Sequence, residues 1–174
     1  MQNQGLVILY TGDGKGKTTA ALGQAVRAAG HGLRICIIQF IKGKWETGEA
    51  RAAKNHLTEL VEFHTLGTGF TWKEEESSVR EAGRKAWEFA KEAVLSDRFD
   101  LVVLDELTYL VNYRIVEELE VIDLLRKRPG HQHVVITGRG ASPGIIQAAD
   151  LATEMRLLKH PYENGVKAQK GVEF

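Results

Sequence analysis

The chain has 174 residues, 43% of them hydrophobic, and its 23 Lys and Arg balance 23 Asp and Glu. A chain of this length builds one core without disulfides or a structural metal. Zero formal net charge argues against a general nucleic-acid binder and against a protein held on a membrane by charge. No apolar run reaches the roughly 18 residues of a membrane span, and residues 1–5 do not begin a signal peptide. We therefore expect a cytoplasmic protein with a single domain over residues 1–174.

The first expected strand, over residues 6–11, runs into a glycine-rich turn and then a helix over 17–29. The turn and the helix start read Gly12, Asp13, Gly14, Lys15, Gly16, Lys17, Thr18 and Thr19. Glycines let backbone N–H groups curl around an anion, the helix N-terminus adds partial positive charge, and a lysine adds a full charge. The sequence therefore predicts that these residues bind the triphosphate of ATP, with Lys17 on a phosphate and the Thr18 hydroxyl toward Mg²⁺.

This turn departs from the usual G-x-x-x-x-G-K-[ST] pattern, because Thr11 stands at the first glycine position. A dinucleotide-binding turn is the main competitor among α/β folds. It would need glycine where Lys17 stands, and a carboxylate at the end of the second strand, where Gln39 and Phe40 stand. We set that alternative aside. A glycine-rich turn without a ligand is disfavoured by the strand before it and the helix after it.

The second expected strand covers residues 33–40 and contains Cys36, the only cysteine. Its apolar surroundings favour an inert buried thiol over a reactive one. Residues 41–50 are then predicted as an irregular loop. In α/β sheets such loops lie at strand ends, where ligands bind.

A third strand is expected over residues 61–65, followed by a second irregular stretch over 66–73. Phe70 and Trp72 lie two positions apart in this stretch. By itself, that spacing favours one face of a strand in the core. A long amphipathic helix is expected next, over 74–95, with acidic residues in its first turn.

The fourth expected strand, over residues 100–105, ends in two carboxylates, Asp105 and Glu106. An acidic group at the end of a buried strand is the usual partner of magnesium beside a phosphate loop. We expect one of the two to hold that ion, directly or through water. The alternative is that one of them merely caps the segment that follows.

A helix is expected over residues 115–128, before Pro129 and Gly130. Its apolar face is assigned to Leu119, Ile122, Leu124 and Leu125. The fifth strand, over 132–138, leads to Arg139, which either contacts a phosphate bidentately or forms a surface ion pair. Four further lysines could contribute to an anion site, although each alone is more often solvated: Lys15, Lys42, Lys159 and Lys167.

Ser142 and Pro143 are read as the N-cap and first residue of a short last helix, and a sixth strand is expected over 151–157. Strands that alternate with helices are typical of βαβ units. The sequence therefore predicts an α/β protein with a RecA-like P-loop NTPase fold, in which helices cover both faces of a mostly parallel sheet.

The residues at these strand ends resemble the P-loop ATP:corrinoid adenosyltransferases, and the likeness runs nearly end to end. The blocks that carry it, in the family's order, are residues 11–21, 39–43, 68–72, 103–109, 128–131, 136–140 and 166–171. The family shares the departure at Thr11. Its loop often reads Gly-Asn-Gly where this one reads Gly-Asp-Gly, so that Asp13 either points away from the phosphates or alters metal use.

The resemblance implies that cobalt(I) of a reduced corrinoid attacks the 5′ carbon of ATP and expels triphosphate. It further implies Mg²⁺, an external electron donor such as a flavoprotein reductase, and a homodimer. Lys17 would act in catalysis, in a loop that holds ATP reversed relative to other P-loop proteins. Phe70 and Trp72 match the aromatic pair that packs beneath the corrin and displaces its lower axial ligand. With the resemblance, we favour this role over a place in the core.

Two other functions fit a phosphate loop. A hydrolase or kinase would use Glu106 to orient a nucleophile toward the γ-phosphate and would release phosphate, not triphosphate. A carrier module would bind ATP and corrinoid and consume neither. None of the six histidines has the spacing of a metal site or of a protein ligand to cobalt.

Overall fold

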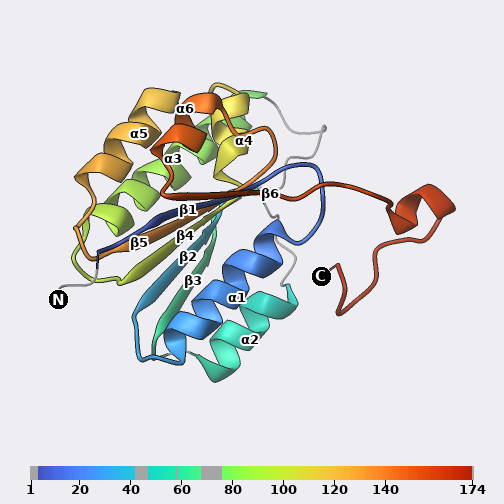
Figure 1. Ribbon diagram of the computed structural model, residues 1–174, viewed down its shortest axis with the longest axis horizontal. Coiled ribbons are helices and arrows are strands. Elements are labelled where there is room, and N and C mark those ends of the chain that lie inside the picture. Colours follow the sequence, from blue (N-terminus) through green and yellow to red (C-terminus); the bar gives the residue numbers. More distant parts are fainter. Residues whose placement is uncertain (1–3, 42–46, 58, 68–75, 174) are drawn as a thin grey trace.

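The computed structural model describes residues 4–41, 47–57, 59–67 and 76–173. Within them, six strands form one sheet in the order β3-β2-β4-β5-β1-β6 (Figure 1). All five pairings are parallel. The strands are β1 Val7–Thr11, β2 Ile35–Gln39, β3 Val61–Thr65, β4 Leu101–Asp105, β5 His133–Thr137 and β6 Leu151–Glu154.

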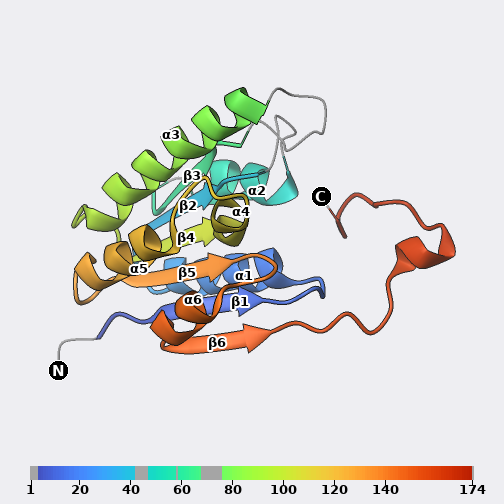
Figure 2. The ribbon, with the colours of Figure 1, turned by 90° about the horizontal axis from the view of Figure 1, so that it is seen from above.

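Helices cover both faces of this sheet. In Figure 1, α1 (Lys17–Ala29) and α2 (Gly48–His56) lie on one face. The other face is covered by α3 Glu76–Leu95, α4 Leu107–Asn112, α5 Glu118–Lys127 and α6 Pro143–Ala148. A 3₁₀ helix, Pro161–Asn164, follows β6 in the extended segment that leads to the C-terminus (Figure 2). The predicted α/β sheet with helices on both faces is confirmed.

Successive side chains along each strand point to opposite faces of the sheet, and because both kinds of position hold apolar residues, both faces of the sheet are apolar. In β1, Ile8 packs in a cluster with the α1 alanines, whereas Leu9 packs in the cluster with α3 and α5. The same alternation places Ile37 and Ile38 of β2 in opposite clusters. Such a sheet brings the carboxyl ends of β1, β4 and β5 to one edge, and that edge holds the residues of the candidate site.

The predicted strands and long helices are confirmed, with ends that differ from the predicted ones by at most three residues. The helix over 17–29 has the predicted bounds, and the one over 74–95 is described from Glu76. The sixth strand stops at Glu154, not at residue 157, because the next residue leaves the sheet to follow the glycine turn. Met155 N donates to Thr11 O at 2.8 Å, and Met155 O accepts from Gly14 N at 2.7 Å.

Two helices were missed. The irregular stretch predicted over 41–50 is wrong from Gly48 onward, where α2 begins. Its start signals were present in the sequence: Thr47 is the N-cap, its side chain accepts from Ala50 N, and Glu49 lies in the first turn. The short α4 was also not expected. It is held by burial of Leu107 and Leu110 and has only 6 residues, too few for a periodic pattern.

The apolar face predicted for 115–128 is partly wrong. Ile122, Leu124 and Leu125 are buried, but Leu119 is 70% exposed. Val121 is fully buried and shifts the packed face of α5 away from Leu119. At the start of α6, Ser142 is the N-cap residue and Pro143 begins the helix as predicted, but the Ser142 hydroxyl donates to Glu118 instead of capping.

Candidate active site

The glycine turn wraps the N-terminus of α1 and has backbone angles that glycine alone adopts readily. Gly12 has φ of 96° and Gly16, the N-cap of α1, has φ of 103°. A Cβ at Gly12 would also lie 2.5 Å from Met155 O. Thr11, the unusual residue before the turn, accepts a hydrogen bond from Ala141 N at 3.2 Å. The chain after β5 is thereby tied to the base of the turn.

Lys17 points into the turn. Its ammonium donates to Gly12 O at 2.7 Å and to Gly14 O at 2.6 Å, and the residue is 6% exposed. Burial lowers the pKa of this ammonium, Glu106 acts against that shift, and Arg139 adds to it. A positive charge that is held in place but poorly solvated gains strongly from a nearby phosphate.

A hydrogen-bond network joins the turn to the ends of three strands through Asp105. The Asp105 carboxylate has no solvent exposure. Its Oδ1 accepts from the hydroxyls of Thr18 at 2.8 Å and Thr137 at 2.7 Å, and its Oδ2 accepts from Gln39 Nε2 at 3.0 Å. Three donors compensate the buried negative charge. We refer to Thr18, Gln39, Asp105 and Thr137 as the Asp105 network.

Glu106 follows Asp105 and turns toward the cavity. Its φ of 65° is a conformation that non-glycine residues rarely adopt. The backbone N–H of Glu106 donates to the Thr137 hydroxyl at 2.9 Å, which holds this conformation in place. Glu106 occupies the N-cap position of α4 but makes no side-chain cap hydrogen bond. The alternative that one carboxylate merely caps the next segment is therefore not supported by this geometry.

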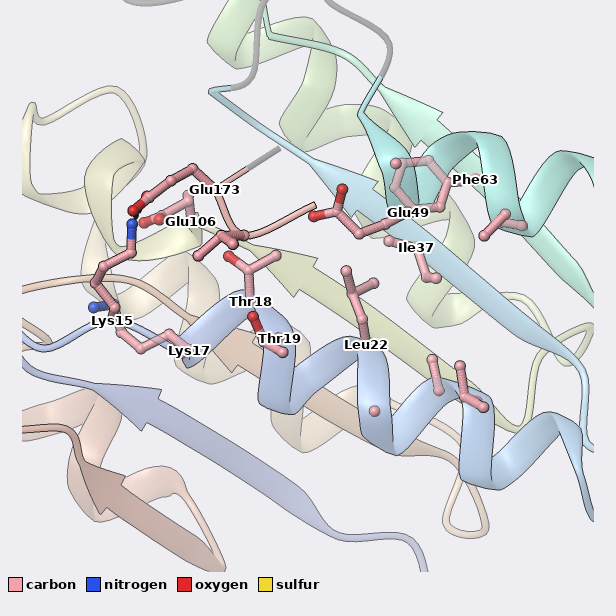
Figure 3. Close-up of a pocket in the computed structure, with 18 of the residues that line it drawn as sticks. Lys15, Lys17, Thr18, Thr19, Leu22, Ile37, Glu49, Phe63, Glu106 and Glu173 are labelled. Carbon is pink, nitrogen blue, oxygen red and sulfur yellow. Dashed lines mark ion pairs between the residues drawn. The ribbon is translucent and has the colours of Figure 1, made fainter. Parts of the chain in front are cut away.

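A cavity of about 730 Å³ opens beside the turn, between α1, α2 and the C-terminal segment. Figure 3 shows Lys17, Thr18 and Glu106 at one end and Leu22, Ile37 and Phe63 at the other. Its polar end is lined by residues from six places along the chain: 14–19, Glu106, Tyr109, Arg139, His160 and 171–173. Six of the predicted ATP-binding positions, Gly14 to Thr19, thus share one cavity with Glu106 and Arg139.

The C-terminal segment crosses this polar end. Glu173 forms an ion pair with Lys15, and the pair lies beside Glu106 in Figure 3. Gly171 and Val172 line the same cavity. A carboxylate therefore lies against one of the lysines predicted to bind phosphate.

Arg139 is exposed and lines the cavity, and its backbone is well anchored. Arg139 O accepts from Thr108 Oγ1 at 2.7 Å and from Asn112 Nδ2 at 3.1 Å. Gly138 before it has φ of 141°, and a Cβ there would lie 2.0 Å from Thr108 Oγ1. The backbone that carries the Arg139 side chain is therefore held in place beside the cavity.

Not every predicted site residue lies at this cavity. Asp13 is exposed and is not among the residues that line it, although its charge acts on the Lys17 ammonium. Gly12 also lies outside the lining and contributes its carbonyl to Lys17. Phe70 and Trp72, together with Lys42, fall outside the described residues.

The residues at this site fit a magnesium ion that also binds water and phosphates better than a metal ion coordinated only by protein side chains. Among the described residues, no three His, Cys, Asp or Glu side chains gather into a metal cluster. Thr18, Asp105 and Glu106 offer oxygen atoms, and Asp105 already accepts hydrogen bonds on both of its oxygens. Mg²⁺ suits such a site, because it takes one or two protein oxygens plus water and substrate phosphates.

The sequence profile of the ATP:corrinoid adenosyltransferases BtuR/CobO/CobP matches residues 3–174. The chain belongs to this family. It is 46% identical to the corrinoid adenosyltransferase CobA of Salmonella typhimurium, over 99% of this chain and 87% of the relative. It is 45% identical to the corrinoid adenosyltransferase of Escherichia coli, over 98% of this chain and 86% of that protein. The resemblance inferred from these sequence blocks is confirmed.

A solved structure supports the fold independently. The flagellar accessory protein FlaH from Methanocaldococcus jannaschii aligns with a TM-score of 0.59 over 87% of this chain and 71% of that one, at 11% identity. At this identity the likeness speaks for the fold alone. It agrees with the predicted RecA-like P-loop class. Among the described helices, none combines the length and apolar character that crossing a bilayer requires.

Sequence reasoning gave no role to Gln39, Thr137, Tyr109 or Glu173. Gln39 and Thr137 are polar residues at the ends of buried strands, and that position was the available signal. Tyr109 lines the cavity, and burial raises the pKa of its hydroxyl, with Glu106 adding to the effect. Glu173 gave no local signal, because its contact with Lys15 spans nearly the whole chain.

Proposed function

We propose that this chain transfers the 5′-deoxyadenosyl group of ATP to cobalt(I) of cobalamin or a related corrinoid and releases triphosphate. The observation that carries the proposal is the Lys17 ammonium inside the glycine turn, beside the Asp105 network, in a member of this family. Attack at C5′ makes the whole triphosphate the leaving group. A site that concentrates positive charge on the phosphates stabilises the charge that develops there.

Lys17 and the turn would hold the phosphates. The backbone N–H groups at the start of α1 would donate to a bound phosphate, and Lys17 would supply the full charge. Arg139 would contact the triphosphate from the end of β5, and Lys15, Thr19, Asp13 and the three turn glycines complete the proposed ATP site. Cobalt(I) is already a strong nucleophile. Positioning the substrates and stabilising the leaving group therefore suffice, and no general base is required.

Magnesium, when bound, would offset phosphate charge at the Thr18 end of the turn. Thr18 would offer its hydroxyl oxygen, and Glu106 its carboxylate from the cavity wall. Asp105 would act on the ion through water or through Thr18, since three side chains already donate to it. The Asp105 network thus orients the Thr18 hydroxyl.

Phe70 and Trp72 are proposed to pack beneath the corrin and displace its lower axial ligand, which makes the cobalt easier to reduce. The electron would come from an external donor, for which a flavoprotein reductase is our proposal. We further propose a cytoplasmic homodimer in which residues 1–174 form a single domain. Support for these points is the family membership, together with the match of the blocks that contain the two aromatic residues.

An anaerobic assay tests the proposed reaction. The protein is mixed with MgATP and chemically reduced cobalt(I) corrinoid, the cobalt(I) absorbance is followed, and the phosphate product is identified. We expect loss of the cobalt(I) signal, a light-sensitive corrinoid and intact triphosphate. Release of phosphate with an unchanged corrinoid would instead identify an ATPase or kinase that acts at the γ-phosphate, and binding without any product would identify a carrier.

A further inference from the structure

The short helix α4 joins the two strand ends that bring Glu106 and Arg139 to the cavity. It begins directly after Glu106, and its Thr108, which is 1% exposed, faces the segment after β5. The Thr108 hydroxyl donates to Arg139 O at 2.7 Å. Asn112 lies one turn further along the same face of α4, and its Nδ2 donates to the same oxygen at 3.1 Å. We call Thr108 and Asn112 the α4 clamp.

The segment held by the clamp allows α4 to approach its backbone closely. Arg139 lies between Gly138 and Gly140, whose φ angles of 141° and 57° cost glycine little. A Cβ at Gly138 would collide with the Thr108 hydroxyl, and a Cβ at Gly140 would lie 3.3 Å from Asn112 Nδ2. Each glycine therefore leaves room for one residue of the clamp.

Glycine on both sides of Arg139 makes the order of this segment depend on the clamp. Glycine loses more conformational freedom than other residues when its backbone is fixed. Where hydrogen bonds within the protein already fix the backbone, a ligand that contacts the segment does not have to order it and binds more tightly. The side chain of Arg139 is exposed, so the clamp fixes where it starts and leaves its rotamers to the ligand.

Arg139 is close enough to the glycine turn for its charge to act there. It lines the same cavity as Lys17. Burial lowers the pKa of the Lys17 ammonium, and the charge of Arg139 lowers it further. Two cations held near one another repel, and an anion that contacts both of them relieves the repulsion. The position of the Arg139 backbone therefore matters for binding an anion in the turn.

We propose that Thr108 and Asn112 are positioning residues, which hold the Arg139 backbone so that its guanidinium meets the triphosphate without reordering the segment. The inference rests on the proposed function in taking triphosphate as the group that Arg139 contacts. Neither clamp residue is among the described residues that line the cavity, so both act on the phosphates only through Arg139.

A double-mutant cycle on the full chain tests the proposal, with inorganic tripolyphosphate in Mg²⁺ as the ligand and calorimetry as the measurement. Thr108→Val replaces the donor with a methyl group of similar size, Thr108→Ser keeps the hydroxyl, and Arg139→Ala removes the guanidinium. The variant that carries both Thr108→Val and Arg139→Ala completes the cycle. Asn112→Ala, which removes the second donor, replaces Thr108→Val in the cycle if Thr108→Val unfolds.

Leu110→Val is the matched control in the same helix. Leu110 is fully buried, and its Cδ2 would lie 3.3 Å from a Cβ at Gly83 of α3, so it packs toward α3. The change weakens the packing of α4 without removing a donor to Arg139. Chemical denaturation of each variant measures how much stability it has lost.

We expect Arg139→Ala to weaken tripolyphosphate binding by about tenfold or more and Thr108→Val to weaken it by about fivefold. Thr108→Ser and Leu110→Val should stay within about twofold of the parent. In the Arg139→Ala background, Thr108→Val should change the affinity by less than about twofold, because the residue through which it acts is gone.

Unchanged binding in Thr108→Val would overturn the proposal, as would unchanged binding in Arg139→Ala. Equal weakening by Thr108→Val with and without Arg139 would also overturn it and leave Thr108 a structural role alone. A loss in Leu110→Val as large as that in Thr108→Val would do the same. Failure of the proposed function looks different: the cycle would show the expected dependence on Arg139, yet the cobalt(I) assay would give no triphosphate.

Discussion

At the scale of single residues, Asp105 shows how hydrogen bonds compensate a buried negative charge. The carboxylate is removed from water, and three side chains from three other elements donate to it. Thr137 does two things at once, because its hydroxyl donates to Asp105 and accepts from Glu106 N. A single hydroxyl therefore links the buried carboxylate to the strained residue that faces the cavity.

Thr137→Val should disrupt both contacts. It leaves the Glu106 N–H without this acceptor and removes one donor from Asp105, which we expect to cost about 1–3 kcal/mol of unfolding free energy. MgATP binding should weaken more than ATP binding measured in EDTA. Chemical denaturation and calorimetry measure the two effects. Thr137→Ser keeps the hydroxyl and is the control; equal losses for Ser and Val would show that the methyl group, not the hydroxyl, matters.

Lys17→Ala should abolish ATP-dependent turnover, because the triphosphate loses the one ammonium held inside the turn. We expect a loss of at least about a hundredfold in kcat/KM, which corresponds to about 2.7 kcal/mol of transition-state stabilisation. The cobalt(I) assay measures it. Turnover near the parent rate would refute the assignment of the phosphate loop.

Glu173→Gln should strengthen ATP binding at low salt. The Glu173 carboxylate pairs with Lys15 at the polar end of the cavity, where it competes with phosphate for the lysine and repels the incoming anion. The side chain of Lys15 is 44% exposed, so we expect a modest gain of up to about fivefold that disappears in high salt. Weaker binding by the variant would instead make Glu173 part of the closed site.

At the scale of elements, the sequence predicted those helices whose start, apolar face and end are all set by residues within the same segment. The bounds of α1 were correct because glycines, an apolar face and a glycine stop all lie within one segment. In contrast, α2 was missed although Thr47 and Glu49 marked its start, because its lone buried residue, Ala53, gives it almost no apolar period. Leu119 was misplaced because only the packing partner decides which side of α5 is buried.

Cys36 in β2 should be inert, as its apolar surroundings predicted. The thiol is fully buried, and burial raises its pKa to about 12, with Glu62 adding to the shift. The thiolate is the reactive form, so the native protein should resist iodoacetamide up to at least about pH 10. Mass spectrometry after alkylation checks this, with denatured protein as the positive control. Rapid alkylation of the folded protein would contradict the burial of β2.

At the scale of the whole molecule, ligand binding should stabilise the fold, because the site is assembled from elements far apart in the chain. At a hundred times its dissociation constant, MgATP should add about 2.7 kcal/mol. For a chain of this size, that raises the melting temperature by roughly 5–10 °C. Scanning fluorimetry measures the shift. Lys17→Ala should lose it, and a full shift in that variant would place the nucleotide elsewhere.

The sequence by itself determined the fold class, the glycine-rich turn before α1 and the family. Each depends on residues that are neighbours in the chain, such as Gly12 to Thr19, or on blocks in a fixed order. The carboxylates at the end of β4 were also predicted, because the carboxyl ends of parallel strands meet at one edge.

Only the tertiary structure decided how these parts meet. Asp105 reaches Thr18 across 87 positions and Gln39 across 66, and no local pattern encodes such a contact. The cavity wall formed by Leu22, Ile37 and Phe63 and the pairing of Glu173 with Lys15 likewise depend on how α1, α2 and the C-terminal segment pack. Periodicity indicates which side of a helix or strand is apolar. Whether another element covers that side, and which one, is decided by how the whole chain packs.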